Sequence, residues 1–265
     1  MKDIYSYCHD YLLDAKPSNV TIPQIDSLVS EADSEHCSGL DGVYRMLAIV
    51  LQDYQCLPIS IKFSEREATY RELLCDYDVS KVAKLSRDEI YGRFANAYAF
   101  KTKNQKRSNI RKYAYGLYDV AVFLNGFEDY GSFKKFVNNF GRDKYTKEAL
   151  PLLLEEEIFG LGFASACNWL KELGFKEYPK SDTHMIDTFS SIGLCNKDLV
   201  SCYKAMVDVA AQCEVKPYKL DKVIWLICSQ EFYRLGVKAT KSEAAKGKAK
   251  FLASLHDWYF DSKDL

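Results

Sequence analysis

The chain of 265 residues lacks several features that mark membrane, secreted or metal-binding proteins. No run approaches the roughly 18 apolar residues that a membrane span needs. The first residues contain no apolar segment of the kind found in a secretory signal. The nine cysteines form no Cys-x-x-Cys pair, which argues against a zinc or redox motif of that type. We therefore expect a cytoplasmic protein without membrane contact, whose reduced cysteines mostly fill its core.

Net charge is also nearly absent, because 36 basic and 37 acidic residues leave a formal charge of −1. Such a protein has no long-range attraction for a polyanion, so any contact with nucleic acid must depend on local patches. Residues 1–41 hold eight acids and two lysines, and we expect this stretch to face away from DNA. Residues 101–112 hold six cations and are followed by three tyrosines. This pattern predicts either a basic patch or a solvated helix face with its aromatics turned to the core.

Proline and glycine are sparse, with six and thirteen residues, and apolar residues recur at helical spacing almost throughout, as in 43–51. We expect an all-α protein of ten to twelve helices without an internal repeat. The length permits one large domain or two compact lobes. The stretch 238–250, rich in Lys, Ala and Gly, is expected to be a mobile connection.

Residues 158–184 are the most informative part of the chain. They follow a predicted helix at 150–157 and contain a tight turn, Phe-Gly-Leu-Gly at 159–162, and a second predicted helix at 163–173. Gly160 can adopt a positive φ, and Gly162 leaves the backbone uncovered by a side chain. The amides of Gly160, Gly162 and Ala164 are therefore candidates for binding one phosphate.

A further helix is predicted to begin at Ser-Asp-Thr-His, residues 181–184, and to end before Gly193. Asp182 has the position and the chemistry of an ordinary N-cap. The helix dipole also favours the ionised form of a carboxylate at a helix start. An ionised carboxylate can stabilise positive charge that develops on a substrate during a reaction. Both interpretations of Asp182 remain open at this point.

The two motifs together resemble those of the helix-hairpin-helix DNA glycosylase superfamily, of the endonuclease III and MutY type. That family shows Leu-Pro-Gly-Val-Gly-x-Lys-Thr-Ala and then Val-Asp-Thr-His at a similar distance. This chain reads Ile-Phe-Gly-Leu-Gly-Phe-Ala-Ser-Ala over 158–166 and Ser-Asp-Thr-His over 181–184. The resemblance covers roughly residues 40 to 195. It implies a two-lobed helical fold, with a six-helix lobe at 40–176 and a second lobe of 1–39 plus 177–265.

By this resemblance, Asp182 is the catalytic aspartate, and Ala164 stands where bifunctional members carry a lysine nucleophile. Alanine cannot form a Schiff base, so the resemblance implies a monofunctional DNA glycosylase that flips out a damaged or modified base and removes it hydrolytically. The product would be an abasic site. Lys180 is a substitute amine that the family pattern does not support. The excised base, and the choice between water activation and sugar-cation stabilisation by Asp182, stay open.

The resemblance also implies a monomer that binds double-stranded DNA. Beyond the three hairpin residues, the expected DNA contacts are Gln55, Lys106 and Arg107. The expected residues of a base pocket or wedge are Gln52, Asp53, Tyr54 and Phe163. No cofactor is required, but a Na⁺ or K⁺ ion is expected at the backbone carbonyls of Glu156, Ile158 and Leu161. No iron–sulfur cluster is expected, because Cys195, Cys202, Cys213 and Cys228 are more widely spaced than cluster ligands in the family.

Two other functions fit the same sequence. One is a helix-hairpin-helix protein that binds DNA without catalysis, which the missing lysine and the near-neutral charge allow. The other is an all-α scaffold for protein contacts.

Overall fold

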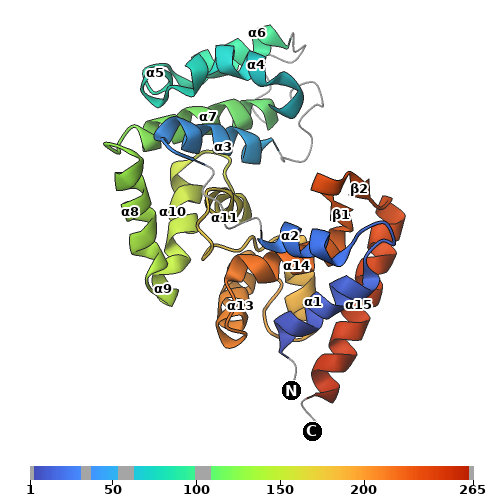
Figure 1. Cartoon of the computed structure of the whole chain (residues 1–265). Helices are drawn as coiled ribbons and strands as arrows, with labels where there is room; N and C mark the ends of the chain where they lie inside the picture. The colour runs from blue at the N-terminus through green and yellow to red at the C-terminus, as the bar shows by residue number, and fades with distance from the viewer. Residues whose placement is uncertain (1–2, 31–36, 53–62, 99–108, 263–265) are drawn as a thin grey trace. The chain divides into compact units, whose positions relative to one another are not determined.

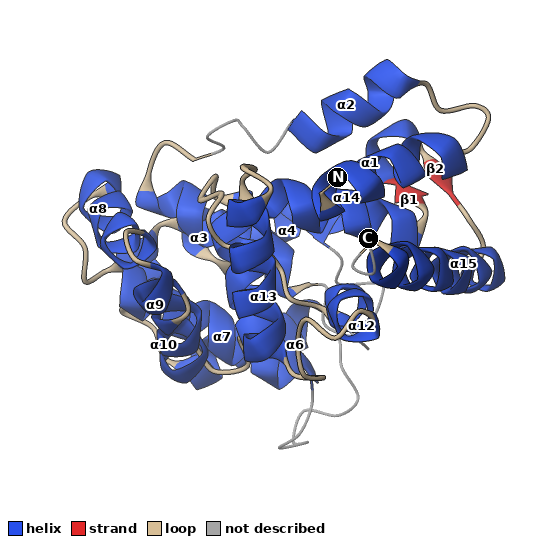
Figure 2. Ribbon diagram, turned by 90° about the horizontal axis from the view of Figure 1, so that it is seen from below, coloured by secondary structure: helices blue, strands red, loops and turns tan. Residues whose placement is uncertain are grey.

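The computed structural model describes residues 3–30, 37–52, 63–98 and 109–262 of the chain (Figure 1). The chain divides into two compact units, Met1–Ser34 with Gly174–Leu265 (unit 1) and Glu35–Leu173 (unit 2). The lobes expected from the sequence divide the chain at 39/40 and 176/177. The described residues are almost entirely helical, with one short pair of strands (Figure 2). The predicted all-α class is confirmed.

Unit 2 is formed by consecutive helices. They are α3 (Leu40–Leu51), α4 (Phe63–Leu73), the 3₁₀-helix η3 (Cys75–Tyr77), α5 (Val79–Val82), α6 (Arg87–Ala97), α7 (Asn109–Leu124), α8 (Tyr130–Gly141), α9 (Lys144–Lys147), α10 (Ala149–Glu157) and α11 (Phe163–Glu172).

Helix α7 is the centre of unit 2, because it packs against α3, α5, α6 and α10. Its apolar residues extend around much of its surface, as in a helix that is covered on several sides. Two buried hydrogen bonds link neighbouring elements to α3. The Tyr113 hydroxyl donates to Ala48 O at 2.8 Å, and Trp169 Nε1 of α11 donates to Val43 O at 3.2 Å.

Unit 1 combines the start and the end of the chain. Its elements are α1 (Ile4–Ala15), α2 (Ile22–Ser30), α12 (Thr183–Ser191), α13 (Leu199–Gln212), α14 (Pro217–Ser229), β1 (Glu231–Phe232), the 3₁₀-helix η4 (Tyr233–Leu235), β2 (Val237–Lys238) and α15 (Lys241–Asp261). The two strands are antiparallel, and Glu231 lies opposite Lys238.

Helix α14 is the centre of unit 1, and it packs against α1, α2, α12, α13 and α15. Nine of its residues are buried, so this helix, like α7, is covered on several sides. Pro217 stands at its first turn, where a missing backbone N–H leaves no hydrogen bond unmade.

Two expectations need correction. The stretch 238–250 is not a mobile connection, because most of it forms the first half of α15. Thr240 and Glu243 start that helix with a reciprocal capping box, which offsets the low helix propensity of Gly247. The described residues also contain fifteen α-helices rather than ten to twelve. Single-turn helices such as α5 and α9 are too short for hydrophobic periodicity to reveal.

None of the helices in the described ranges is long and apolar enough to cross a membrane.

Helix α7 lies very close to the connection between α10 and α11. A Cβ atom added to Gly116 would lie 2.8 Å from the carbonyl oxygen of Phe159 and 3.3 Å from Leu51 Cδ1. A glycine is therefore required here by the close approach of two backbones.

We predict that Gly116→Ala destabilises the protein by about 1–2 kcal/mol, because the overpacking penalty exceeds the gain in helix propensity. Gly92→Ala on α6 is the matched control, since its Cβ would meet no atom within 4 Å. It should stabilise the protein by up to about 1 kcal/mol. Urea unfolding measures both changes, and equal stability of the two variants would contradict the close approach.

Candidate functional site

The glycine turn, residues 158–162, connects α10 to α11. The observed helices, Ala149–Glu157 and Phe163–Glu172, agree with the predicted 150–157 and 163–173 to within one residue at each end. Gly160 has a φ of 83°, a conformation that favours glycine. Leu161 N donates to Ile158 O at 3.0 Å, and Gly162 is the N-cap of α11. Glycine at position 160 and the hydrogen bond within the turn therefore favour this conformation locally.

Several backbone donors of the turn are unused. Within the described part of the chain, the amides of Gly160, Gly162 and Ala164 make no hydrogen bond. Gly162 is exposed, whereas Ala164 is half-buried. These three amides are the ones predicted from the sequence to bind a phosphate. Unpaired amides at a helix start attract anions, because the helix dipole adds to their partial charge.

A buried carboxylate holds the turn in place. Asp119 on α7 is 6% exposed and accepts three hydrogen bonds. Two come from Arg87 on α6, from Nε at 2.7 Å and from Nη2 at 2.8 Å, and the third comes from Phe159 N at 2.9 Å. A buried charge is costly unless it is paired and hydrogen-bonded, and here both conditions are met. Sequence reasoning missed this network, because its members lie 32 and 40 residues apart.

Arginine and aromatic side chains surround the same turn. Phe159 is 44% exposed, and the Arg87 guanidinium lies 5.9 Å from the centre of its ring. The rings of Phe159 and Tyr115 are 5.9 Å apart, and Arg111 lies 4.9 Å from the Tyr115 ring. We call Arg87, Arg111, Tyr115 and Phe159 the Arg-aromatic cluster. Guanidinium and aromatic groups are the side chains that most often contact phosphates and unstacked bases.

Acidic residues also lie near the turn. Glu155, Glu156 and Glu157 end α10 and are exposed. The carboxylate of Glu155 would lie 3.9 Å from a Cβ atom placed on Gly162. This charge opposes an anion at the turn, and the positive charge of Arg87 is offset by Asp119, with which it pairs.

Asp182 in unit 1 is the N-cap of α12, as predicted. Its Oδ1 atom accepts hydrogen bonds from His184 N at 2.9 Å and Met185 N at 3.4 Å. Among the described residues, its Oδ2 atom has no hydrogen-bond donor. The residue is half-buried, and its neighbour Ser181 is fully buried. The cap therefore uses one carboxylate oxygen and leaves the other available.

The segment before Asp182 is held by a second buried carboxylate. Asp221 on α14 is 1% exposed, and its Oδ2 atom accepts a hydrogen bond from Lys180 N at 3.0 Å. In addition, Tyr218 N donates to Lys176 O at 3.3 Å. Two interactions with α14 thus anchor the chain that leads into α12.

A histidine and an ion pair lie beside this cap. Burial lowers the pKa of His184, and the positive charges of Lys248 and Lys180 lower it further, although Asp182 and Asp187 act in the opposite direction. Lys248 Nζ on α15 lies 2.5 Å from Asp187 Oδ2. The buried Nδ1 atom of His184 has no hydrogen-bond partner in the described structure. These observations indicate a neutral imidazole at pH 7.

The remaining predicted residues fall into three groups. Gln52 ends α3, and its side-chain oxygen accepts a hydrogen bond from Phe63 N at 2.7 Å. Phe163 is 1% exposed and belongs to the core, so its ring is not presented to a base. Outside the described residues lie five predicted site residues, namely Asp53, Tyr54, Gln55, Lys106 and Arg107.

The expected Na⁺ or K⁺ ion and the expected absence of an iron–sulfur cluster both stay predictions. Of the three carbonyls expected to bind the ion, that of Ile158 accepts the Leu161 amide inside the glycine turn, and Glu156 lies in the last turn of α10. No group of three or more His, Cys, Asp or Glu side chains suited to a metal occurs in the part of the chain that the structure describes.

We predict that Asp119→Asn lowers the free energy of unfolding by about 1–3 kcal/mol, because one of its three donors loses its acceptor. Hydrogen exchange of the Phe159 amide should accelerate more than that of other amides in unit 2. Asp88→Asn on the neighbouring helix is the control, because the Asp88 side chain is 78% exposed where it pairs with Arg111. That change should cost less than about 1 kcal/mol. Unchanged protection at Phe159 would show that Asp119 does not hold the turn.

We predict that the protein becomes less stable as the pH falls below about 6.5, because His184 is neutral in the folded state. The pKa of His184 is lowered in the folded state. At pH values between that pKa and about 6.5, the unfolded chain therefore binds more protons than the folded chain. The free energy of unfolding falls as the pH decreases through this range. The slope is at most about 1.4 kcal/mol per pH unit. His184→Gln should flatten it, whereas His256→Gln at an exposed site should not. Urea unfolding at pH 5.0, 6.0 and 7.0 measures the slopes, and parallel profiles for wild type and His184→Gln would contradict the assignment.

No protein-family model matches the chain, and no curated protein matches it. Among solved structures, the chain is similar to the Methanocaldococcus jannaschii 8-oxoguanine glycosylase/lyase, crystallised in complex with a 15mer DNA containing 8-oxoguanine. The TM-score is 0.49 and the sequence identity is 16%, and the similarity covers 88% of this chain and 98% of that chain.

Proposed function

We propose that this protein is a DNA N-glycosylase that removes a base from double-stranded DNA by hydrolysis and leaves an abasic site, the first step of base excision repair. The two sequence motifs that resemble the helix-hairpin-helix glycosylases support this proposal. The local structure supports it too, since the glycine turn leaves three amides unused and Asp182 begins a helix.

The observation that carries the proposal is the state of the Asp182 carboxylate. One oxygen caps α12, while the other has no donor among the described residues. Breaking an N-glycosidic bond develops positive charge on the sugar. A carboxylate about 4 Å from that charge contributes about 4 kcal/mol at an effective dielectric near 20, or about a thousandfold in rate. An acid that already has its helix-capping partners can supply this interaction without rearrangement.

The reaction needs only water as a second reactant. The water oxygen forms a bond to C1′ while the bond from C1′ to the base nitrogen breaks, and the base leaves with the electron pair and gains a proton. Asp182 either orients and deprotonates the water or stabilises the sugar cation. The base must leave the helical stack first, because C1′ and the leaving nitrogen are shielded inside the duplex.

Ala164 determines the proposed product. A bifunctional enzyme attacks C1′ with an amine and then cleaves the strand, whereas alanine has no nucleophile. Lys180 is the amine nearest in sequence to Asp182, but the resemblance gives it no role as a nucleophile. We therefore propose base removal without strand cleavage, by a monomer that requires no cofactor.

The proposed DNA contacts are the three turn amides and the Arg-aromatic cluster. The cluster supplies two guanidinium groups and an exposed ring next to the turn. A Na⁺ or K⁺ ion at the carbonyls of Glu156, Ile158 and Leu161 would offset the acids at the end of α10, which lie near the turn.

Base removal by Asp182→Asn should be slower than that of the wild type by about a hundredfold to a thousandfold, with DNA affinity retained. Asparagine caps helices about as well as aspartate, so the fold should survive. Asp198→Asn is the matched control, because Asp198 caps α13 through a 2.8 Å hydrogen bond from Ser201 N. It should keep full activity. The assay uses duplexes that carry oxidised, alkylated, mismatched or otherwise modified bases, followed by alkali to cut abasic sites.

Three results would contradict parts of the proposal. Salt-sensitive DNA binding without turnover on any duplex would indicate a DNA-binding protein without catalysis. Absent or salt-insensitive binding would favour a protein-interaction scaffold. A borohydride crosslink between protein and DNA would show that an amine nucleophile exists, and mutation of Lys180 would then test its identity.

A further inference from the structure

The connection between α12 and α13 brings two cysteines into contact. Cys195 lies in this connection, and Cys202 lies near the start of α13. The Cys202 thiol donates a hydrogen bond to the Cys195 sulfur. Cys202 is fully buried, whereas Cys195 is partly exposed. Neither residue takes part in the proposed glycosylase reaction, so an inference about this pair does not depend on that activity.

Hydrogen bonds of the backbone keep the two sulfurs together. Asn196 N donates to Ser201 Oγ at 2.9 Å. This bond joins the residue that follows one cysteine to the residue that precedes the other. Ser201 N donates in turn to Asp198 Oδ1 at 2.8 Å, which caps α13, and Leu194 N donates to Phe189 O at 2.9 Å, at the end of α12. The folded connection therefore holds the thiols next to each other before any oxidation.

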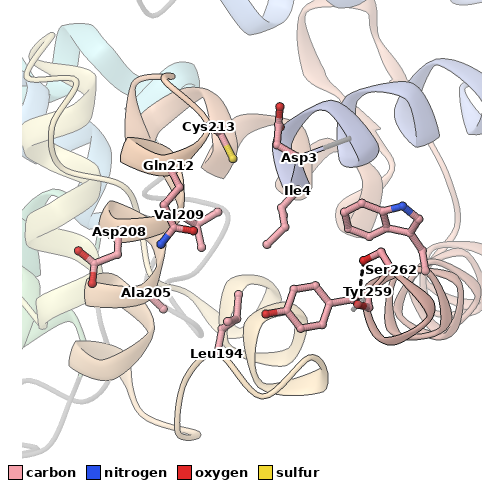
Figure 3. A pocket seen from close by; sticks show the side chains of 11 residues that line it. Asp3, Ile4, Leu194, Ala205, Asp208, Val209, Gln212, Cys213, Tyr259 and Ser262 are labelled. Atoms are coloured by element: carbon pink, nitrogen blue, oxygen red, sulfur yellow. Dashed lines mark hydrogen bonds between the residues drawn. The ribbon is translucent and has the colours of Figure 1, made fainter. Parts of the chain in front are cut away.

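The same connection borders a pocket of unit 1. The pocket has a volume of about 560 Å³, and it is formed by the beginning of α1, the segment after α12, α13 and the end of α15 (Figure 3). Leu194, which precedes Cys195, and Ala205, which follows Cys202 by less than one helical turn, both line it. A covalent bond between the two cysteines would therefore join two parts of the pocket wall.

We propose that Cys195 and Cys202 form a site of reversible oxidation, at which hydrogen peroxide converts the two thiols to a disulfide. The Cys195 sulfur attacks one peroxide oxygen, the O–O bond breaks, and the thiol proton leaves with the other oxygen as water. The product is a sulfenic acid. The Cys202 sulfur then attacks the sulfenic sulfur, and its proton leaves with the hydroxyl group as a second water. The two thiols lose two electrons in total, which reduce one peroxide to two waters.

Exposure and hydrogen bonding determine the order of these steps. A small oxidant reaches the sulfur of Cys195, because Cys202 is 0% exposed. Burial raises the pKa of both thiols, and the charge of Asp198 raises that of Cys195 further, although the hydrogen bond from Cys202 acts in the opposite direction. The first step is therefore slow at pH 7, since the thiolate is the reactive form. The second step is fast, because contact gives the resolving thiol a high effective concentration.

Peptide mapping of the full-length protein tests the proposal. Trypsin cleaves after Lys197, which places the two cysteines in separate peptides, 181–197 and 198–204, with one cysteine in each. The folded protein is oxidised with hydrogen peroxide at about pH 8.5, where more of each thiol is ionised, and is then alkylated and digested. Mass spectrometry should find these two peptides linked, in about tenfold excess over any other cysteine pair. Dithiothreitol should separate them.

Cys195→Ser should remove the link without disturbing the fold, because the side chain is partly exposed. Cys213→Ser is the matched control. Cys213 is a partly exposed cysteine at the other end of α13, and its sulfur points toward Asp3, with which it is hydrogen-bonded (Figure 3). This change should leave the link intact. Circular dichroism confirms that both variants are folded.

Wild-type protein oxidised in urea provides a second control, because unfolding removes the contact between the two thiols. The link between 181–197 and 198–204 should then lose its excess over the other pairs. The proposal fails if the folded protein gives no such link, or if the link has the same share in folded and unfolded protein. It also fails if Cys213→Ser removes the link as completely as Cys195→Ser does.

Discussion

Two buried carboxylates hold the connections that contain the two sequence motifs. Asp119 and Asp221 are the charged residues buried within the described structure, and each lies on the central helix of its unit. Each accepts a backbone N–H from a connection that contains a sequence motif, Phe159 in one unit and Lys180 in the other. Burying a charge is unfavourable unless strong donors surround it. Asp119 meets this requirement with three donors, and its need for them holds the glycine turn in place, whereas Asp221 holds the second connection through the Lys180 N–H.

This arrangement separates the polar groups that build the fold from the polar groups that remain available. In the glycine turn, Asp119 takes the Phe159 amide and Ile158 takes the Leu161 amide, which leaves the amides on either side of Leu161 unpaired. At α12 the separation is within one side chain, since Oδ1 of Asp182 caps the helix and Oδ2 does not. Polar groups left over after folding are the ones that can bind a ligand without first breaking a structural hydrogen bond.

The near-zero net charge of the chain recurs around the glycine turn. The guanidinium groups of Arg87 and Arg111 lie beside the exposed Phe159 ring, but Arg87 pairs with Asp119 and Arg111 pairs with Asp88. Electrostatic attraction between exposed charges decays within about 8–10 Å at physiological ionic strength. The unpaired backbone amides of the turn are therefore the donors near it that no carboxylate of the described structure occupies.

The sequence by itself determined the features that depend on neighbouring residues. Helical periodicity, glycines at 160, 174 and 193 and the cap at Asp182 all act within one or two turns, and they set the helix ends around the two motifs. Periodicity failed at the Lys- and Ala-rich start of α15, where the capping box at Thr240 starts a helix without a strong apolar pattern. Only the tertiary structure decided which carboxylate meets which amide, because Asp119 and Phe159, like Lys180 and Asp221, lie some 40 residues apart. The pocket likewise exists only after helix packing brings α1, α13 and α15 together, since no short stretch of sequence specifies contacts among them.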